Sequence, residues 1–235
     1  EIQAVNRAFN RMTSQLQQSQ RDRALLLAGV SNDLRTPLTR LRLSAEFLND
    51  EEMSQGIIAD IEDMDAILDQ FISFIRDGAD EQPDYENLND LIDEVAAKYP
   101  GEQLRIRQKD LPRLMLKRLT VKRMLSNLIT NALKYGAAPV EIDTALDDNA
   151  LVLVVRDHGK GVREEDIPLL LQPFSRGEKA RTLSGSGLGL AIVKHVMIRH
   201  NGKLEIKSEL GSGSNFTCHF PASRLVSKPT ALASG

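Results

Sequence analysis

The chain has 235 residues, of which 41% are hydrophobic and 27% charged, and its formal net charge is −3. These proportions are typical of a globular protein and exclude collagen-like and wholly disordered chains. The small negative charge and the lack of a large basic block argue against a protein that binds nucleic acid through its phosphates. The single cysteine, Cys218, can form neither an intrachain disulfide nor a cysteine-based metal site by itself, which favours a reducing compartment. No apolar run approaches the roughly 20 residues that a membrane-spanning helix needs.

The N-terminal part of the chain predicts a helical hairpin. Apolar residues three and four positions apart run through residues 2–16 and 27–48, and a further seam occupies 57–75. Residues 49–56 lie between the seams and predict the hairpin loop. Two narrow seams bury too little surface alone, so we expect a homodimer in which two hairpins form an all-α four-helix bundle.

The C-terminal part mixes helices and strands after an acidic stretch, 77–84, that is rich in Gly and Pro and predicts a linker. The apolar run 151–155 is typical of a central strand. Periodicity predicts helices over 88–99, 119–135 and 188–200, and strands over 104–107, 114–117, 140–146, 151–156, 203–208 and 215–220. The expected architecture is an α/β sandwich.

The predicted helix 119–135 has a polar face beside its apolar one. Asn127, Asn131 and Lys134 follow each other at i, i+4 and i+7. Two Asn side chains at this spacing offer amide oxygens to a Mg²⁺ ion that keeps its phosphate ligands, and Lys134 can neutralise those phosphates. A merely solvated face is the alternative interpretation. The predicted apolar stripe consists of Leu125, Leu128, Ile129, Ala132 and Leu133.

A carboxylate and two glycines follow the predicted central strand, as Asp157, Gly159 and Gly161. A carboxylate at a strand end can accept a hydrogen bond from an exocyclic amine such as that of adenine, and glycine lets the backbone approach the ring. A tight turn is the alternative.

A glycine run at Gly185, Gly187 and Gly189 opens directly into the last predicted helix. Backbone N–H groups at a helix N-terminus can cradle polyphosphate. The G-x-G-x-G spacing after a polar loop is neither a dinucleotide fingerprint nor a P-loop. The preceding segment, 173–184, contains Arg176 and predicts either a mobile lid over a nucleotide or an ordinary surface loop.

Four of these stretches together resemble the N, G1, F and G2 boxes of the ATP-binding domain of sensor histidine kinases. They read N-L-I-T-N-A-L-K-Y, D-H-G-K-G, P-F-S-R-G and G-S-G-L-G-L-A-I-V-K. The resemblance implies a sandwich of the Bergerat (GHKL) type that binds ATP and Mg²⁺. It implies Asn131 on Mg²⁺ with Asn127 beside it, Lys134 and Tyr135 near phosphate and sugar, Asp157 on the adenine amine with Gly159 and Gly161 next to it, and Arg176 with Gly185, Gly187, Leu188 and Gly189 at the phosphates.

The hairpin carries a second motif, S-N-D-L-R-T-P-L, in residues 31–38. The seam leaves Asn32 and Thr36 on a shared outward face, and Pro37 bends the helix, which suits docking of a partner; an incidental proline on a solvated face is the alternative. The motif resembles the H box, S-H-[DE]-L-R-T-P-L, and its wider match resembles the osmosensing, EnvZ-type branch of the family. One position departs from the box, because Asn32 stands where the family has its phosphoacceptor histidine.

That departure changes the expected chemistry. An imidazole nitrogen is nucleophilic near neutral pH, whereas the lone pair of an amide nitrogen is delocalised and cannot take a phosphoryl group. We therefore expect no autophosphorylation at Asn32, and none of the four histidines lies in the hairpin to replace it. The intact remaining boxes favour a deliberate substitution over natural degeneration.

The resemblance implies a kinase that delivers the γ-phosphoryl of ATP to position 32, in cis or in trans, and then to the aspartate of an OmpR-like response regulator. It also implies a phosphatase activity on that regulator, in which Asp33 assists proton transfer and Thr36 orients the attacking water. Two alternatives stay open: a phosphatase or scaffold without kinase activity, and another Bergerat-type ATPase such as a chaperone or topoisomerase domain.

The expected organisation has five parts. They are the end of a HAMP-like linker or coiled coil (1–20), the dimerisation and phosphotransfer hairpin (21–78), a linker (79–86), the catalytic ATP-binding domain (87–222) and a disordered tail (223–235). The HAMP-like start implies that this is the cytoplasmic portion of a bacterial inner-membrane protein, with the membrane span upstream and no nucleic-acid partner.

Overall fold

The computed structural model describes residues 12, 34–48, 50–76, 81–147, 150–175 and 187–221. The chain divides into two compact units, one of Glu1–Asp77 with Ser184–Ser186 and one of Gly78–Leu183 with Gly187–Gly235. Several predictions fall outside the described residues, namely the N-terminal seam, the tail and the roles of Asn32, Asp33, Arg176 and Gly185. Within the described part, no helix is long and apolar enough to cross a membrane.

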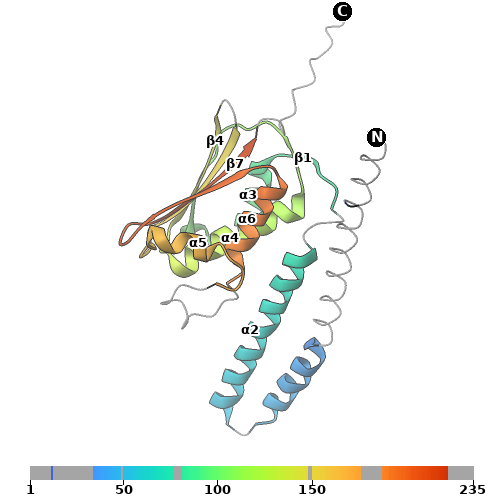
Figure 1. Cartoon of the computed structure of the whole chain (residues 1–235). Helices are drawn as coiled ribbons and strands as arrows, with labels where there is room; N and C mark the ends of the chain where they lie inside the picture. Colours follow the sequence, from blue (N-terminus) through green and yellow to red (C-terminus); the bar gives the residue numbers. More distant parts are fainter. Residues whose placement is uncertain are drawn as a thin grey trace, which may run out of the picture. The chain divides into compact units, whose positions relative to one another are not determined.

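The first unit is a helical hairpin, with one helix over 34–46 and a second, α2, at Glu51–Arg76 (Figure 1). Asp50 begins α2: its Oδ1 accepts a hydrogen bond from the Met53 N–H at 3.0 Å. Glu51 and Glu52 follow in the first turn, where negative charge stabilises the helix dipole. The predicted loop 49–56 was therefore too long, because its acidic residues cap and start the helix instead of forming a turn.

The hairpin seam is only partly buried within one chain. Leu38, Ala45 and Ile61 are buried, and ion pairs join Arg42 to Glu62 at 3.3 Å and Arg35 to Asp65 at 3.8 Å. Leu68 and Phe71 are half-buried, whereas five apolar seam positions are exposed, namely Leu34, Leu41, Leu48, Ile57 and Met64. These exposed positions repeat every seven residues on each helix, so they form a second apolar stripe that the hairpin itself does not cover.

The second unit contains a mixed five-stranded sheet in the order β2-β4-β5-β7-β6. β2 pairs with β4 in parallel, and the other neighbours are antiparallel. The strands are β2 (Leu104–Arg107), β4 (Val140–Asp147), β5 (Ala150–Asp157), β6 (Lys203–Glu209) and β7 (Gly213–Pro221); a separate antiparallel pair joins β1 (Asp84–Glu86) to β3 (Leu114–Leu116). Alternate residues of β4, β5 and β7 are buried, so one face of the sheet is the core face.

Three helices cover that core face: α3 (Leu88–Ala96), α4 (Arg118–Tyr135) and α6 (Gly189–Arg199) (Figure 1). The apolar side chains of α3 recur at i, i+3, i+4 and i+7, and the Asn87 side chain caps the helix by accepting from the Asn89 N–H. A short helix, α5 (Ile167–Leu170), follows the 3₁₀ turn η2 (Glu164–Asp166), and a second 3₁₀ turn, η1 (Gly101–Gln103), precedes β2. The predicted hairpin and α/β sandwich are both confirmed.

The segment before α3 belongs to the second unit. The Glu81 carboxylate accepts hydrogen bonds from the Thr120 N–H at 3.1 Å and the Thr120 hydroxyl at 2.6 Å, so it caps α4 from outside the helix. β1 then pairs with β3. Residues 81–86 of the predicted linker are thus ordered parts of the α/β unit, because a distant carboxylate and a strand pairing, neither visible in local sequence, hold them.

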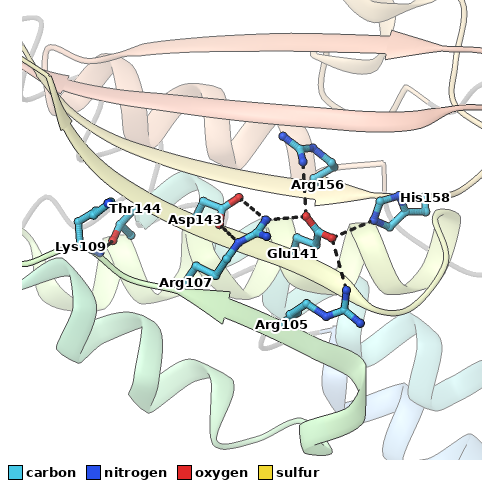
Figure 2. Close-up of polar contacts among 8 residues, drawn as sticks. All are labelled: Arg105, Arg107, Lys109, Glu141, Asp143, Thr144, Arg156 and His158. Carbon is cyan, nitrogen blue, oxygen red and sulfur yellow. Dashed lines mark hydrogen bonds and ion pairs between the residues drawn. The ribbon is translucent and has the colours of Figure 1, made fainter.

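The opposite face of the sheet carries a network of ion pairs centred on Glu141 (Figure 2). The Glu141 carboxylate lies 2.8 Å from Arg107, 3.4 Å from Arg156 and 3.5 Å from the His158 ring nitrogen. Arg107 also binds Asp143, which raises the pKa of its guanidinium. Charged side chains therefore occupy this face, and α4, which carries Asn127 and Asn131, covers the other one.

Candidate functional site

Helix α4 supplies the central element of the candidate site. Its buried residues include Leu125, Leu128, Ile129 and Ala132, as predicted, whereas Leu133 is only half-buried and lies at the edge of the stripe. Asn127 and Asn131 are half-buried and Lys134 is exposed, so the polar face predicted from the spacing exists.

One end of the site joins α4 to the start of α6. The Asn127 amide donates to the Arg123 carbonyl at 2.9 Å, which turns its Oδ1 toward α6. A Cβ atom added to Gly189 would lie 3.2 Å from this oxygen. Leu188, the residue before α6, provides no side-chain cap for the first-turn N–H groups of this helix. The helix N–H groups here can donate to phosphate oxygens, and the Asn127 amide oxygen beside them can serve as a ligand of a cation.

The other end of the site joins α4 to the end of β5. A Cβ atom at Gly159 would lie 2.3 Å from the Gly136 Cα, and one at Gly136 would lie 2.6 Å from the Asp157 Cγ. The backbones therefore touch because both positions are glycine. Gly136 is the C-cap of α4, so this contact fixes the buried Asp157 carboxylate against the end of the helix. Asn127 and Gly136 are nine residues apart, and the two ends of the site are separated by about 14 Å along α4.

The Asp157 carboxylate is buried and hydrogen-bonded at once. Burial raises its pKa above the ordinary value of 3.8, and hydrogen bonds from the Gly159 and Ser214 N–H groups and the Ser214 hydroxyl oppose that rise. The Gly159 N–H lies 2.9 Å from Asp157 Oδ1. Ser214 was missed by sequence reasoning: β7 brings it opposite Asp157 in the register, and no local pattern indicates that pairing.

The remaining predicted residues lie around these two ends. Tyr135 and Lys134 are exposed at the last turn of α4, with the Lys134 ammonium 5.7 Å from the Tyr135 ring centroid. Gly161 packs against the β6–β7 turn, and Gly187 packs against Ser175 and Phe174, where a Cβ atom would lie 2.8 Å from the Ser175 carbonyl. The structure thus places the described parts of the F and G2 stretches side by side.

The oxygen ligands that the site offers to a cation come from amide groups rather than from carboxylates. Among the described residues no group of three or more His, Cys, Asp or Glu side chains could hold a metal ion. Asn127 Oδ1 and the half-buried Asn131 lie one helical turn apart on the polar face of α4. This donor set fits an ion such as Mg²⁺ that keeps water and phosphate oxygens as most of its ligands.

A buried histidine, also missed by the sequence reasoning, fixes α6 relative to α4. His200 is 1% exposed; its Nδ1 lies 2.8 Å from the Val196 carbonyl, and its Nε2 accepts from the Lys117 N–H at 3.2 Å. The two contacts together require a neutral ring with the proton on Nδ1. His200 therefore joins the end of α6 to the start of α4, the two helices that supply the phosphate-side groups.

In the hairpin, Thr36 is exposed on the helix over 34–46, and this helix continues through Pro37. The neighbouring Arg35 pairs with Asp65 of α2. Thr36 is thus on the surface of the hairpin, as the spacing predicted.

Two family models match the chain. Residues 117–224 match the histidine kinase-, DNA gyrase B- and HSP90-like ATPase family, and residues 22–79 match the His Kinase A (phospho-acceptor) domain. The second unit is therefore an ATPase domain of this class. The chain thus joins a phosphoacceptor-type domain to an ATPase domain, the two domains that the models describe for histidine kinases.

Individual relatives agree with this assignment. The phosphate regulon sensor protein PhoR of Pseudomonas aeruginosa is 33% identical over 90% of this chain and 52% of its own. The signal transduction histidine-protein kinase/phosphatase MprB of Mycolicibacterium paratuberculosis is 29% identical over 91% of this chain and 45% of its own. The chain thus spans about half the length of these relatives. The crystal structure of full-length ShkA in complex with AMPPNP has the same fold, with a TM-score of 0.66 and 22% identity over 83% of this chain and 45% of that one.

Proposed function

We propose that this chain is the dimerisation and ATP-binding region of a sensor histidine kinase whose kinase output is blocked at Asn32. The observation that carries the ATP-binding part is the Asp157 site, where a buried carboxylate is held against the C-cap of α4 while Asn127 faces the start of α6. A carboxylate acceptor at one end and helix N–H groups at the other match the base and the phosphates of a nucleoside triphosphate. The AMPPNP of the ShkA structure supports the same choice of ligand.

Each predicted residue has a defined task in this proposal. Asp157 accepts the hydrogen bond of the adenine amine, and Gly159 and Gly161 let the backbone lie beside the ring. Asn131, with Asn127 beside it, would hold Mg²⁺, which supplies charge neutralisation at the phosphates, and Lys134 adds to it. Tyr135 lies at the sugar. Gly185, Gly187, Leu188, Gly189 and Arg176 contact the phosphates.

The hairpin decides what happens to the phosphoryl group. The amide of Asn32 has no nucleophilic lone pair, so bound ATP has no acceptor at the H-box position. Asp33 and Thr36 do not depend on the missing imidazole. We therefore propose that the chain retains the phosphatase activity of the family toward an OmpR-like regulator. The relative MprB, a histidine-protein kinase/phosphatase, supports pairing these activities in one protein.

The whole protein would be a homodimer anchored in the bacterial inner membrane through a segment upstream of a HAMP-like linker, with this region in the cytoplasm. The apolar stripe that the hairpin leaves exposed supports dimerisation, since Leu41 and Met64 are 55% and 52% exposed. The osmosensing, EnvZ-type assignment rests on the H-box stretch of the sequence alone.

The decisive experiment is incubation of the chain and its Asn32→His variant with γ-labelled ATP and Mg²⁺. We expect label on the variant and none on the parent chain. Asn49→His is the matched control, because it introduces the same side chain into the same hairpin outside the H-box, and it should stay unlabelled. Equal labelling of parent and variant would refute the block at Asn32, and label on none of the three would refute the kinase assignment.

The alternative hypothesis, a phosphatase without kinase activity, is tested with a purified OmpR-like receiver domain that a small phosphodonor has phosphorylated. The parent chain should accelerate its dephosphorylation, and Thr36→Ala should slow that reaction without changing nucleotide affinity. Acceleration by the parent together with an unlabelled Asn32→His variant would favour a phosphatase or scaffold over a kinase.

A further inference from the structure

The turn between β6 and β7 lies against the segment that follows Asp157. The Gly211 N–H donates to the Lys160 carbonyl at 2.8 Å. A Cβ atom at Gly161 would lie 2.0 Å from the Glu209 carbonyl oxygen, and one at Gly213 would lie 2.1 Å from the Asp157 carbonyl oxygen. Both glycines have positive φ, 61° and 87°, which other residues rarely adopt. The two segments are therefore in backbone contact on both sides of the turn.

Ser208, at the end of β6, connects these segments through its hydroxyl. The Val162 N–H donates to Ser208 Oγ at 2.8 Å, and the Ser208 hydroxyl lies 2.9 Å from the Gly213 carbonyl. The Ser214 hydroxyl oxygen lies 2.9 Å from Ser208 Oγ. Ser208 thus contacts the exit of the Asp157 loop and the start of β7 with one half-buried side chain.

The Ser208 contacts continue to Asp157 through Ser214. Ser214 lies opposite Asp157 in the register, and its N–H and hydroxyl stabilise the ionised form of that carboxylate. Each serine has one hydroxyl proton. The Ser208 proton has two acceptors at 2.9 Å, the Gly213 carbonyl and Ser214 Oγ, while Ser208 Oγ accepts the Val162 N–H. Sharing of this proton with Ser214 Oγ leaves the Ser214 proton to point at Asp157.

We propose that Ser208 is a positioning residue for adenine recognition: it orients Ser214 and the loop 158–162 so that the Asp157 carboxylate faces the exocyclic amine. This inference rests on the proposed ATP site and deepens it. Ser208 does not touch the nucleotide in this arrangement. Its removal should therefore weaken recognition of the base and leave contacts to the phosphates unchanged.

The test compares Ser208→Ala with the parent chain in binding of ATP and of inosine triphosphate, which has the same phosphates and sugar but lacks the amine. Loss of one hydrogen bond predicts that the Kd for ATP rises about fivefold. The Kd for inosine triphosphate should change less than twofold, so that discrimination between the two falls. Ser208→Thr keeps the hydroxyl and should restore discrimination.

Ser212→Ala is the matched control, because Ser212 lies exposed on the same turn and should leave both affinities unchanged. Parent-like discrimination in Ser208→Ala, or an equal loss for both nucleotides, would overturn the positioning role. A parent chain that binds neither nucleotide would instead refute the proposed ATP site, so the two failures are distinct.

Discussion

The two units of the chain differ in how completely each buries its own apolar surface. In the hairpin, Leu38, Ala45 and Ile61 are the buried apolar residues among those described, and the large side chains of Phe47, Leu41 and Met64 are more than half exposed. In the α/β unit, long side chains from helices and strands, such as Leu128, Leu151 and Phe220, are fully buried. The comparison indicates that the α/β unit has a complete core in one chain, whereas the hairpin core needs a second apolar surface.

The largest expected effect is the loss of an α/β core side chain. Phe220→Ala removes a fully buried ring that packs edge-on against His200, and we expect it to destabilise this unit by about 3–5 kcal/mol. Cys218 gives a direct measurement, because burial raises the pKa of its thiol to about 12 and keeps it unreactive while the unit is folded. Thiol labelling should accelerate in Phe220→Ala. Unchanged protection would contradict a complete core.

The exposed hairpin stripe predicts a separate effect on oligomeric state. Leu41→Asp places a charge on the stripe, and we expect it to weaken the dimer about 100-fold or more. Leu43→Asp is the matched control: Leu43 is the same residue type on the same helix, 51% exposed against 55% for Leu41, but lies outside the seam. Analytical ultracentrifugation should show a monomer only for Leu41→Asp. Equal behaviour of the two variants would mean that the seam is not the interface.

Nucleotide affinity should depend on the ionisation of Asp157. Asp157→Asn removes the charged acceptor, and we expect ATP binding to fall about 10- to 100-fold. Burial raises the folded pKa of Asp157, so affinity in the parent chain should fall as the pH drops through a value above 3.8, whereas the weak binding of Asp157→Asn should show no such step.

Ionisation of Asp157 should change the folding stability of the α/β unit in the opposite direction from its effect on ATP affinity. A raised carboxylate pKa means that the folded state keeps its proton to higher pH than the unfolded one, so ionised Asp157 lowers the stability of the α/β unit. Asp157→Asn should therefore unfold at the same or a higher denaturant concentration at neutral pH. A clear loss of both stability and binding would assign Asp157 to the fold rather than to the site.

The smallest expected effect concerns the surface between α3 and α4. Glu94 pairs with Lys122 at 2.8 Å and with Arg118, and both contacts lower its pKa below the ordinary value of 4.5. The stabilisation is present above that value and is lost as the pH falls through the lowered pKa. Because the pair is exposed, Glu94→Gln should lower the unfolding midpoint only slightly, and less at 1 M salt. A large loss would show that the surface pair, rather than the core, holds α3 on α4.

The sequence by itself determined the local features of this protein. Periodicities of two and of 3.6 residues predicted three strands and three helices of the α/β unit with ends close to those observed, namely β4, β5, β7, α3, α4 and α6. Burial on one face imposes those periods. The polar face of α4 and the position of Asp157 at a strand end were predicted for the same reason. The prediction that Asn32 blocks phosphorylation likewise depends on the chemistry of a single side chain.

The tertiary structure decided every feature that joins distant segments. The cap of α4 by Glu81, the contact of Gly136 with Gly159, the His200 contact to Lys117 and the alignment of Ser214 with Asp157 each link residues far apart in sequence. Strand register and the approach of two backbones depend on how whole elements pack, and no local pattern contains that information. The same reason explains the hairpin, where the sequence predicted one seam and the structure divided it into a buried and an exposed stripe.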